Sequence, residues 1–383
     1  ISITGTPSSG FGIRFRDKVN ADDATNNDRT LTLDSGVNSS IRADHKIGDS
    51  QPLAGLTVAQ SRNADFRNVV DVTDSNAGTI TITDTANGRN IVFRGTTTAD
   101  SFVTTTEAYD IFFFSNATFA NAVTFQNGGT LDLGNGSSDD ITFNGGVTEN
   151  SGGIVTIDGA IVSSNDAISF GNVRFGTNTS ITSAGGAISI GNITSHGTNH
   201  DITITSSGGS ANTVAVGTIS SNINAVAITG STSVTLNGNI TTNNNSGNSV
   251  TITGGTINTG AITIDTNNTD HDGAITFDGA IAGGNNNLAL DSGSANISAN
   301  GAIGSVGTLT LTSAATATLS GDVDVTTLTI GNGVANVAFT GNGSSVASSF
   351  TPNNTGTFVF GTSGGTQTYN SGLNTASVDG TVT

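Results

Sequence analysis

The 383-residue sequence contains no cysteine, no methionine and no tryptophan. Without cysteine the chain has no disulfide framework, no thiolate zinc site and no thiol nucleophile. Charged residues make up only 10% of the chain, against a typical share of about 25%. The content of Ile, Val, Leu and Phe still separates it from disordered chains, which combine low hydrophobicity with high net charge.

Positive charge is especially scarce. There are 11 Lys and Arg against 29 Asp and Glu, which gives a formal net charge of −18. Ten of the 11 basic residues lie at or before Arg94 and Arg174 is the last, so residues 175–383 contain nine Asp and no Lys, Arg or Glu. Nucleic acids and anionic membrane surfaces both attract Lys and Arg. We therefore expect no nucleic acid partner and no membrane-surface partner.

Long hydrophobic runs are also missing. No stretch approaches the roughly 20 apolar residues of a membrane helix, so we expect no membrane insertion. The chain opens at Ile1 without a signal peptide, and we interpret it as a processed chain or a segment of a longer one. A cysteine-free chain is compatible with exposure outside the cell.

Alternation of apolar residues with Thr or Ser is abundant, as at Ile80 and Ile82 or Leu309 and Leu311. Such alternation, bounded by Gly, Asn and Asp, predicts strands and turns. A longer unit places two alternating apolar residues before a Gly or Asn turn and a third apolar residue. It recurs, at an uneven spacing, over 187–193, 213–219, 233–240, 249–257, 274–281, 295–303 and 316–323.

This repeat predicts an all-β fold, a right-handed parallel β-helix (β-solenoid) whose coils stack at about 4.8 Å. We assign residues 76–383 to the β-helix body, which at about 21 residues per coil gives about 14 to 15 coils. Ile, Val, Leu and Phe should form ladders inside, while Thr, Ser and Asn face water. The pattern leaves open whether each coil has two or three strands.

Residues 1–75 differ, because they hold eight of the 11 basic residues. The open end of a solenoid would pair with stray strands unless it is capped. We therefore predict a charged N-terminal cap or subunit-contact region over residues 1–75. No comparable charge marks the other end, so either the chain continues there or that end meets another copy. If copies join, we expect a head-to-tail contact, which builds an open fibre. The predicted subunit-contact residues are Ile1, Ile3, Phe11, Phe15, Val378 and Val382.

Three stretches carry a family resemblance: HKIGDSQPLAGLTVAQ (45–60), NGAIGSVGTLTLTSAATATLSGDV (300–323) and GGTQTYNSGL (364–373). They resemble the repeats of giant bacterial surface proteins of the filamentous-haemagglutinin and autotransporter-adhesin type. The resemblance implies a secreted right-handed parallel β-helix that serves as an adhesin or surface filament. It further implies an extracellular, cell-surface location, with partners that are copies of the chain or a host or environmental glycan or surface.

An enzymatic alternative arises because several β-helix families degrade polysaccharides. Asn268-Thr269-Asp270, Asp139-Asp140 and His196-Gly197 resemble fragments of a polygalacturonase-like site. Their chain order is scrambled, and no basic residue follows Arg174 to hold an anionic sugar. We therefore expect no enzyme activity and no catalytic residue.

Metal binding has one weak candidate, the pair Asp270 and Asp272 in a D-x-D-G stretch that resembles part of a calcium loop. The further acids of such a loop are missing, so a solvated corner is the simpler interpretation. We expect no cofactor, with calcium kept as the alternative.

Two further surface alternatives stay open. Thr-x-Thr pairs, such as Thr203 with Thr205 and Thr251 with Thr253, could order water as in an ice-binding solenoid, but the uneven spacing of the coils argues against their alignment. The Phe-rich stretch 95–175, including Phe112, Phe113 and Phe114, could form an aromatic recognition groove, although packing in a wide core is favoured.

The sequence as a whole favours a non-enzymatic extracellular structural protein, either the subunit of a cell-surface filament or the shaft of an adhesin. The alternatives are a monomeric adhesin and an ice- or glycan-binding β-solenoid.

Overall fold

The computed structural model describes residues 1–5, 10–22, 29–73, 77–150, 152–197, 199–209, 212–361 and 365–383. These residues form 38 strands and no helix. The strands pair in parallel, and the chain makes about 14 turns of a β-solenoid. The predicted all-β parallel β-helix is thereby confirmed, while its right hand and its charged cap stay predictions. The chain divides into two compact units, Ile1–Ser189 and Ile190–Thr383.

Each coil of the first unit contributes a strand or bridge to three faces, which answers the question of two or three strands per coil. Face 1a consists of β1 (Ser2–Thr4), β3 (Thr30–Asp34), β5 (Gly55–Gln60), β8 (Thr79–Ile82), β11 (Ser101–Thr104), β14 (Val123–Phe125), β17 (Val147–Glu149) and β20 (Ile168–Phe170). Face 1b consists of β2 (Phe11–Phe15), β4 (Ser40–Ala43), β6 (Ala64–Phe66), β9 (Asn90–Phe93), β12 (Asp110–Phe113), β15 (Leu131–Leu133), β18 (Val155–Ile157) and β21 (Val173–Phe175). Face 1c consists of β7 (Val70–Val72), β10 (Thr97–Ala99), β13 (Ala117–Phe119), β16 (Asp140–Phe143), β19 (Ala160–Ser163) and β22 (Thr179–Ser183).

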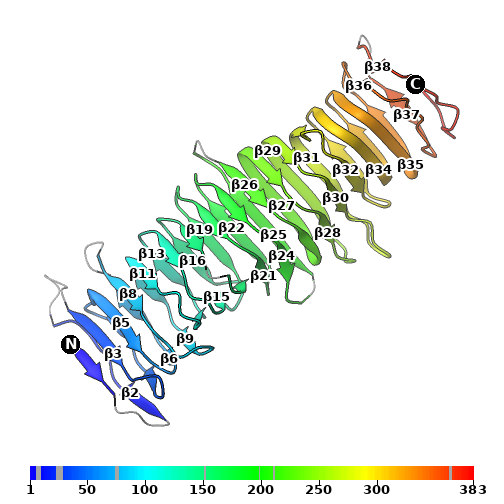
Figure 1. The fold of residues 1–383 in the computed structure, drawn as a ribbon. Coiled ribbons are helices and arrows are strands. Elements are labelled where there is room, and N and C mark those ends of the chain that lie inside the picture. The colour runs from blue at the N-terminus through cyan, green and yellow to red at the C-terminus, as the bar shows by residue number, and fades with distance from the viewer. Residues whose placement is uncertain are drawn as a thin grey trace. The chain divides into compact units, whose positions relative to one another are not determined.

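The second unit has the same three-faced plan, but several of its strands run through a corner and serve more than one face. The strands of this kind are β27 (Ile219–Leu236), β29 (Ser249–Thr259), β31 (Ile275–Ala282), β34 (Ile303–Leu319) and β35 (Val323–Phe339). Figure 1 shows β27, β29 and β31 lying side by side. The shorter strands are β24 (Ile193–Ser195), β25 (His200–Ser206), β26 (Thr213–Val216), β28 (Ile240–Thr242), β30 (Ile262–Asp265), β32 (Leu288–Asp291), β33 (Asn296–Ala299), β36 (Ser345–Val346), β37 (Phe358–Phe360) and β38 (Thr368–Tyr369). The remaining strand, β23 (Ile188–Ile190), spans the division between the units.

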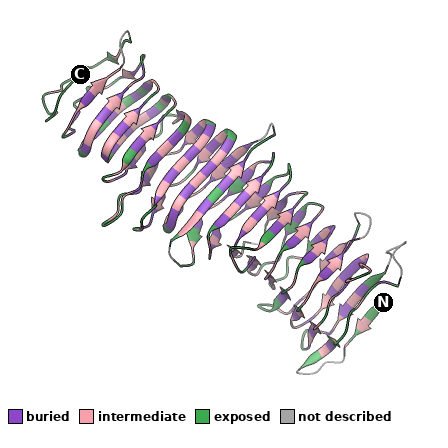
Figure 2. Ribbon diagram, turned by 180° about the vertical axis from the view of Figure 1, so that it is seen from behind, coloured by how far each residue is buried: buried purple, intermediate pink, exposed green. Residues whose placement is uncertain are grey.

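Alternation along the strands separates a buried interior from a polar exterior, as Figure 2 shows by the alternating buried and intermediate segments. In β30, Ile262 and Ile264 point inward and are buried, while Thr263 points outward. Successive side chains of a strand point to opposite faces, so a period of two in the sequence becomes one inner and one outer ladder.

Aromatic rings fill the interior of the first unit where the sequence is rich in Phe. Phe93 stacks between Phe66 and Phe113, with ring centroids 5.0 and 5.1 Å away. Phe113 also meets Phe102 and Phe119 edge-on at 5.4 and 5.6 Å. These rings come from all three faces, and the predicted core role of the Phe-rich stretch is correct for Phe102, Phe113 and Phe119. Phe112 and Phe114 instead lie half-buried on the outside.

Tyr109 is the largest fully buried side chain of this core. Its hydroxyl donates to the carbonyl oxygen of Ile82 at 3.0 Å and accepts the N–H of Thr105 at 3.0 Å. Burial raises the pKa of this phenol above its ordinary value. The hydroxyl therefore satisfies one buried and one partly buried backbone group.

Asparagine side chains at the corners tie successive coils together, a role that the sequence alone did not reveal. In each case the amide oxygen accepts the backbone N–H of a residue in the next coil, at 2.9 to 3.2 Å. The pairs are Asn63 with Asn90, Asn116 with Asp140, Asn192 with Thr218, Asn239 with Thr263, Asn287 with Thr308 and Asn336 with Thr357.

Residues 1–75 belong to the same stack. Their strands β5 and β6 pair in register with β8 and β9 of the following coil. The whole chain, residues 1–75 included, makes about the number of turns that the spacing had predicted for residues 76–383 alone. Val250 and Ile275 pair as the repeat placed them, but one step of the repeat was misassigned, because Val234 pairs with Ile257 and Val250 pairs with Val226. The cap or contact role of residues 1–75 stays a prediction.

Candidate functional site

Three of the predicted contact residues at the N-terminal end, Ile3, Phe11 and Phe15, lie on strands that pair on one side, and Ile1 directly precedes β1. In the described part of the chain, β1 pairs with β3 and β2 with β4. Ile1 is 83% exposed and Phe11 is 47% exposed, whereas Ile3 and Phe15 are half-buried. Near the other end, Val382 is 39% exposed and Val378 is half-buried.

Phe11 lies in a cluster of charged side chains. The guanidinium carbons of Arg14 and Arg42 lie 5.9 and 5.4 Å from the Phe11 ring centroid, within cation–π range. Arg14 and Arg42 are also direct register partners on β2 and β4, and Asp44 binds both, at 2.8 and 2.5 Å. The hydrogen bond from Arg14 is the largest cause that lowers the pKa of the Asp44 carboxyl. One carboxylate thus bridges two stacked guanidinium groups.

A second cluster repeats this arrangement with lysines. Asp49 binds Lys18 and Lys46, each at 2.5 Å. The hydrogen bond from Lys18 leads the causes that lower the pKa of Asp49. Segments 11–19 and 40–49 together carry five Lys or Arg and three Asp. This corner is therefore locally positive in a strongly negative chain.

Beside these clusters the first coil encloses a hollow of about 250 Å³. Its apolar walls come from Ile1, Val19, Leu31 and Leu53. The ion pair between Arg29 and Asp22, 2.7 Å long, borders it. Leu31 and Leu53 at this hollow are buried, whereas Ile1 is exposed.

The two residues of the candidate metal pair, Asp270 and Asp272, form hydrogen bonds with different neighbouring coils. Asp270 accepts the side-chain amide of Asn244 from the preceding coil at 3.1 Å. Asp272 accepts the backbone N–H and the hydroxyl of Ser294 from the following coil, at 2.6 and 2.7 Å. Burial raises the pKa of Asp272, but the hydrogen bonds from Ser294 and Asn268 outweigh it and leave the pKa lowered. The described residues contain no group of three or more His, Asp or Glu placed to hold a metal ion.

The enzyme-like fragments also serve corners. Asp139 accepts the backbone N–H of Asn135 at 2.8 Å. Asn268 donates its amide to the carbonyl of Asn243 at 2.9 Å. These contacts order loops, and the expected lack of enzyme activity stays a prediction.

The outer threonines of the second unit are aligned, contrary to the argument from coil spacing. Thr203 pairs with Ala227, Ala227 with Thr251 and Thr251 with Thr276. The inserted residues lie at corners, so they do not shift the register of the face. The spacing objection to a regular Thr-rich array is therefore wrong here, although Ala227 interrupts the threonines.

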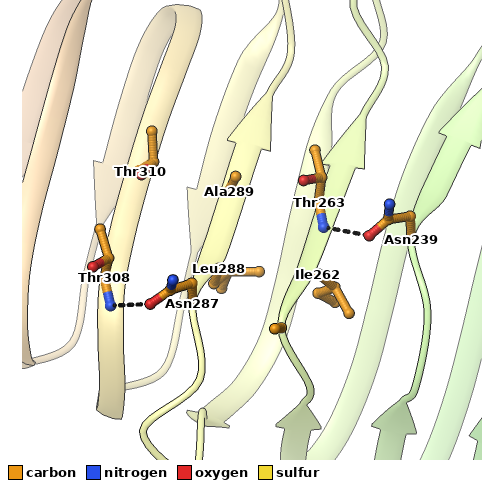
Figure 3. A pocket seen from close by; sticks show the side chains of 9 residues that line it. Asn239, Ile262, Thr263, Asn287, Leu288, Ala289, Thr308 and Thr310 are labelled. Atoms are coloured by element: carbon orange, nitrogen blue, oxygen red, sulfur yellow. Dashed lines mark hydrogen bonds between the residues drawn. The ribbon is translucent and has the colours of Figure 1, made fainter.

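A shallow groove of about 320 Å³ crosses the face formed by β28, β30, β32 and β34. Figure 3 shows Asn239 and Thr263 on one side, Thr308 and Thr310 on the other, and Asn287 and Ala289 between them. The depression exists because Ala261 and Ala289 occupy outer positions that carry longer side chains on neighbouring coils. Buried Ile262 and Leu288 lie beneath it.

Sequence reasoning did not identify two of the lining residues, Asn239 and Asn287, as site residues. The sequence signal was that each asparagine stands immediately before a strand. Most of the other corner asparagines, whose side-chain oxygens accept a backbone N–H of the next coil, occupy similar positions. Asparagine is so common in this chain that this position alone does not distinguish them.

Comparison with known proteins adds no relative, because no family model, curated protein or solved structure matches the chain. Among the described residues no helix has the length and apolar character needed to cross a membrane. The β-solenoid is compatible with the resemblance to haemagglutinin-type surface repeats, but no detected match supports that resemblance.

Proposed function

We propose that this protein is a non-enzymatic extracellular structural protein, a β-solenoid that forms the subunit of a cell-surface filament or the shaft of an adhesin. The observation that supports this most is the coil-to-coil bonding. Parallel backbone pairing continues along three faces, and corner asparagines add side-chain bonds between coils. Each coil is stabilised by its neighbours, which suits a load-bearing shaft.

The proposed assembly is head to tail. The apolar hollow and Phe11 at the first coil would meet the last coils of another copy, where Leu373 and Val382 are exposed. Charge favours this direction, because the first coils carry the two basic clusters and residues 175–383 carry only acidic charges. Such complementarity steers association and is screened by salt.

Negative-stain microscopy of the purified chain tests the assembly. We expect filaments many subunits long that shorten when ionic strength rises from roughly 0.05 to 0.5 M, because the Debye length falls severalfold. Phe11→Asp should abolish filaments, whereas Val103→Asp, at a residue of similar exposure within the body, should keep them. Single particles of wild-type protein at every ionic strength would refute self-assembly and favour a monomeric adhesin shaft.

A second function, binding of a repetitive surface or glycan, is favoured by the aligned outer ladder of Thr203, Ala227, Thr251 and Thr276. Regular stacking places equivalent side chains about 4.8 Å apart. An ice-recrystallisation assay separates ice from other surfaces: unchanged crystal growth at micromolar protein would remove ice from consideration.

A further inference from the structure

The groove in Figure 3 combines two outer ladders of the second unit. Thr263, Ala289 and Thr310 are register partners on three successive coils. Asn287 lies two residues before Ala289, immediately before β32, and Thr308 lies two residues before Thr310 within β34. At about 4.8 Å per coil, the groove extends about 14 Å from the coil of Asn239 to that of Thr310.

Its hydrogen-bonding groups are partly used by the fold and partly free for a ligand. The side-chain oxygens of Asn239 and Asn287 accept the N–H groups of Thr263 and Thr308, at 2.9 and 3.0 Å. Within the described part of the chain, the NH₂ group of each asparagine donates to no other residue. Both asparagines are exposed. Each oxygen bond fixes its amide so that the N–H donors stay available at the rim.

The lining is polar and without charge. None of the nine lining residues is ionisable, and the threonine hydroxyls can both donate and accept. Further along the same strands, Asp265 and Asp291 are register partners, so two carboxylates lie beside the groove. These carboxylates disfavour an anionic ligand. The matching ligand is neutral, rich in hydroxyl groups and long enough to cross several coils.

We propose that this groove binds a neutral, extended polysaccharide whose chain runs across β30, β32 and β34. The amide N–H groups of Asn239 and Asn287 donate to sugar oxygens, and the hydroxyls of Thr263, Thr308 and Thr310 exchange hydrogen bonds with sugar hydroxyls. The gap left by Ala261 and Ala289 admits the sugar rings. This inference rests on the proposed extracellular role, because it names the glycan that the solenoid would contact.

The decisive variant is Asn239→Asp combined with Asn287→Asp. Aspartate keeps an oxygen that accepts the threonine N–H, so the corner bonds remain, but it lacks the N–H donors. Calorimetric titration with cellohexaose, xylohexaose and mannohexaose should show binding of at least one hexasaccharide to the wild type. Each lost hydrogen bond should weaken binding about fivefold, so the double variant should bind about 25-fold more weakly.

Matched controls separate the groove from general effects. Asn116→Asp changes an exposed asparagine with the same type of corner bond on the first unit, and its affinity should equal that of wild type. Ala289→Lys should block the groove, whereas Ala338→Lys, at an outer alanine of another face, should not. Circular dichroism of each variant should show an unchanged β spectrum.

Three results would overturn the proposal: no binding of any of the three hexasaccharides, equal or tighter binding of polygalacturonate, or equal loss in the control variants. Filament formation is scored on the same samples. Wild-type protein that forms filaments but binds no hexasaccharide rejects the groove alone. Wild-type protein that binds a hexasaccharide but forms no filaments rejects the assembly model alone.

Discussion

Phe112 and Phe113 are neighbours in sequence but lie on opposite sides of β12, which makes them a sharp test of the three-faced core. Phe113 is 1% exposed and contacts rings from all three faces, including Phe93 at 5.1 Å and Phe119 at 5.6 Å. Phe112 lies half-buried on the outside, where its ring meets Phe114 at 5.5 Å. We predict very different consequences of truncating the two residues to alanine.

Phe113→Ala removes a ring from a packed interior and leaves a cavity, which typically costs about 4 kcal/mol. Phe112→Ala removes a largely outer contact and should cost less than about 1 kcal/mol. Because a solenoid coil contacts mainly its neighbours, the loss should be local. A loss of about 4 kcal/mol corresponds to about a thousandfold faster exchange where amide protection follows local opening.

Hydrogen-exchange mass spectrometry measures this directly. In Phe113→Ala, peptides covering β9, β12 and β15 should lose protection, while peptides covering β29 and β31 should keep it. In Phe112→Ala all of these peptides should resemble wild type. Equal effects of the two variants, or a loss spread evenly to β29 and β31, would refute both the inward placement of Phe113 and the nearest-neighbour reasoning.

Three further predictions concern single residues. Tyr109→Phe removes the partner of the buried Ile82 carbonyl and of the partly buried Thr105 N–H, so it should lower the unfolding free energy by about 1 to 3 kcal/mol in denaturant titrations. Burial, and to a smaller extent Asp291, raises the pKa of Asp265, so the folded state binds this proton more tightly than the unfolded state. The stability that protonated Asp265 contributes is present at low pH and is lost as pH rises through the raised pKa. Asp265→Asn should therefore stabilise the protein at pH 7 and flatten this part of the pH–stability curve. Gly134 has a φ of +85° and faces a carbonyl oxygen of the next coil, so Gly134→Ala should lower the melting temperature, whereas Gly136→Ala, with open space around it, should not.

The sequence predicted the architecture well because the fold repeats a local rule. Alternating pairs such as Ile80 with Ile82 are buried, as a period of two requires. The number of strands per coil could not be predicted, because short strands and the corners between them use the same Gly, Asn and Thr residues. One step of the repeat was misassigned for a related reason: Val234 and Val250 begin similar sequence units, yet they lie on different faces and Val234 pairs with Ile257.

The groove could not be predicted from the sequence because it depends on residues brought together by register. Thr263, Ala289 and Thr310 are unevenly spaced along the chain, and nothing in that spacing indicates that the three share one ladder. The sequence predicted only that charged residues concentrate in residues 1–75, and it did not predict which of them form ion pairs. That Asp44 bridges Arg14 and Arg42 requires the two arginines to be register partners on successive coils.

Variable corners and constant faces have a consequence for how this solenoid could acquire function. Thr276, Ser298 and Thr318 are unevenly spaced in the sequence, yet each pairs directly with the next. An insertion at a corner therefore changes the loop and leaves the spacing of the outer ladder at about 4.8 Å. A substitution on the face, such as Ala in place of Thr at residue 289, changes the surface without affecting the inner ladder of Leu288 and Leu290. The surface chemistry can thus vary coil by coil while the core stays fixed, because inner and outer ladders alternate residue by residue along the same strands.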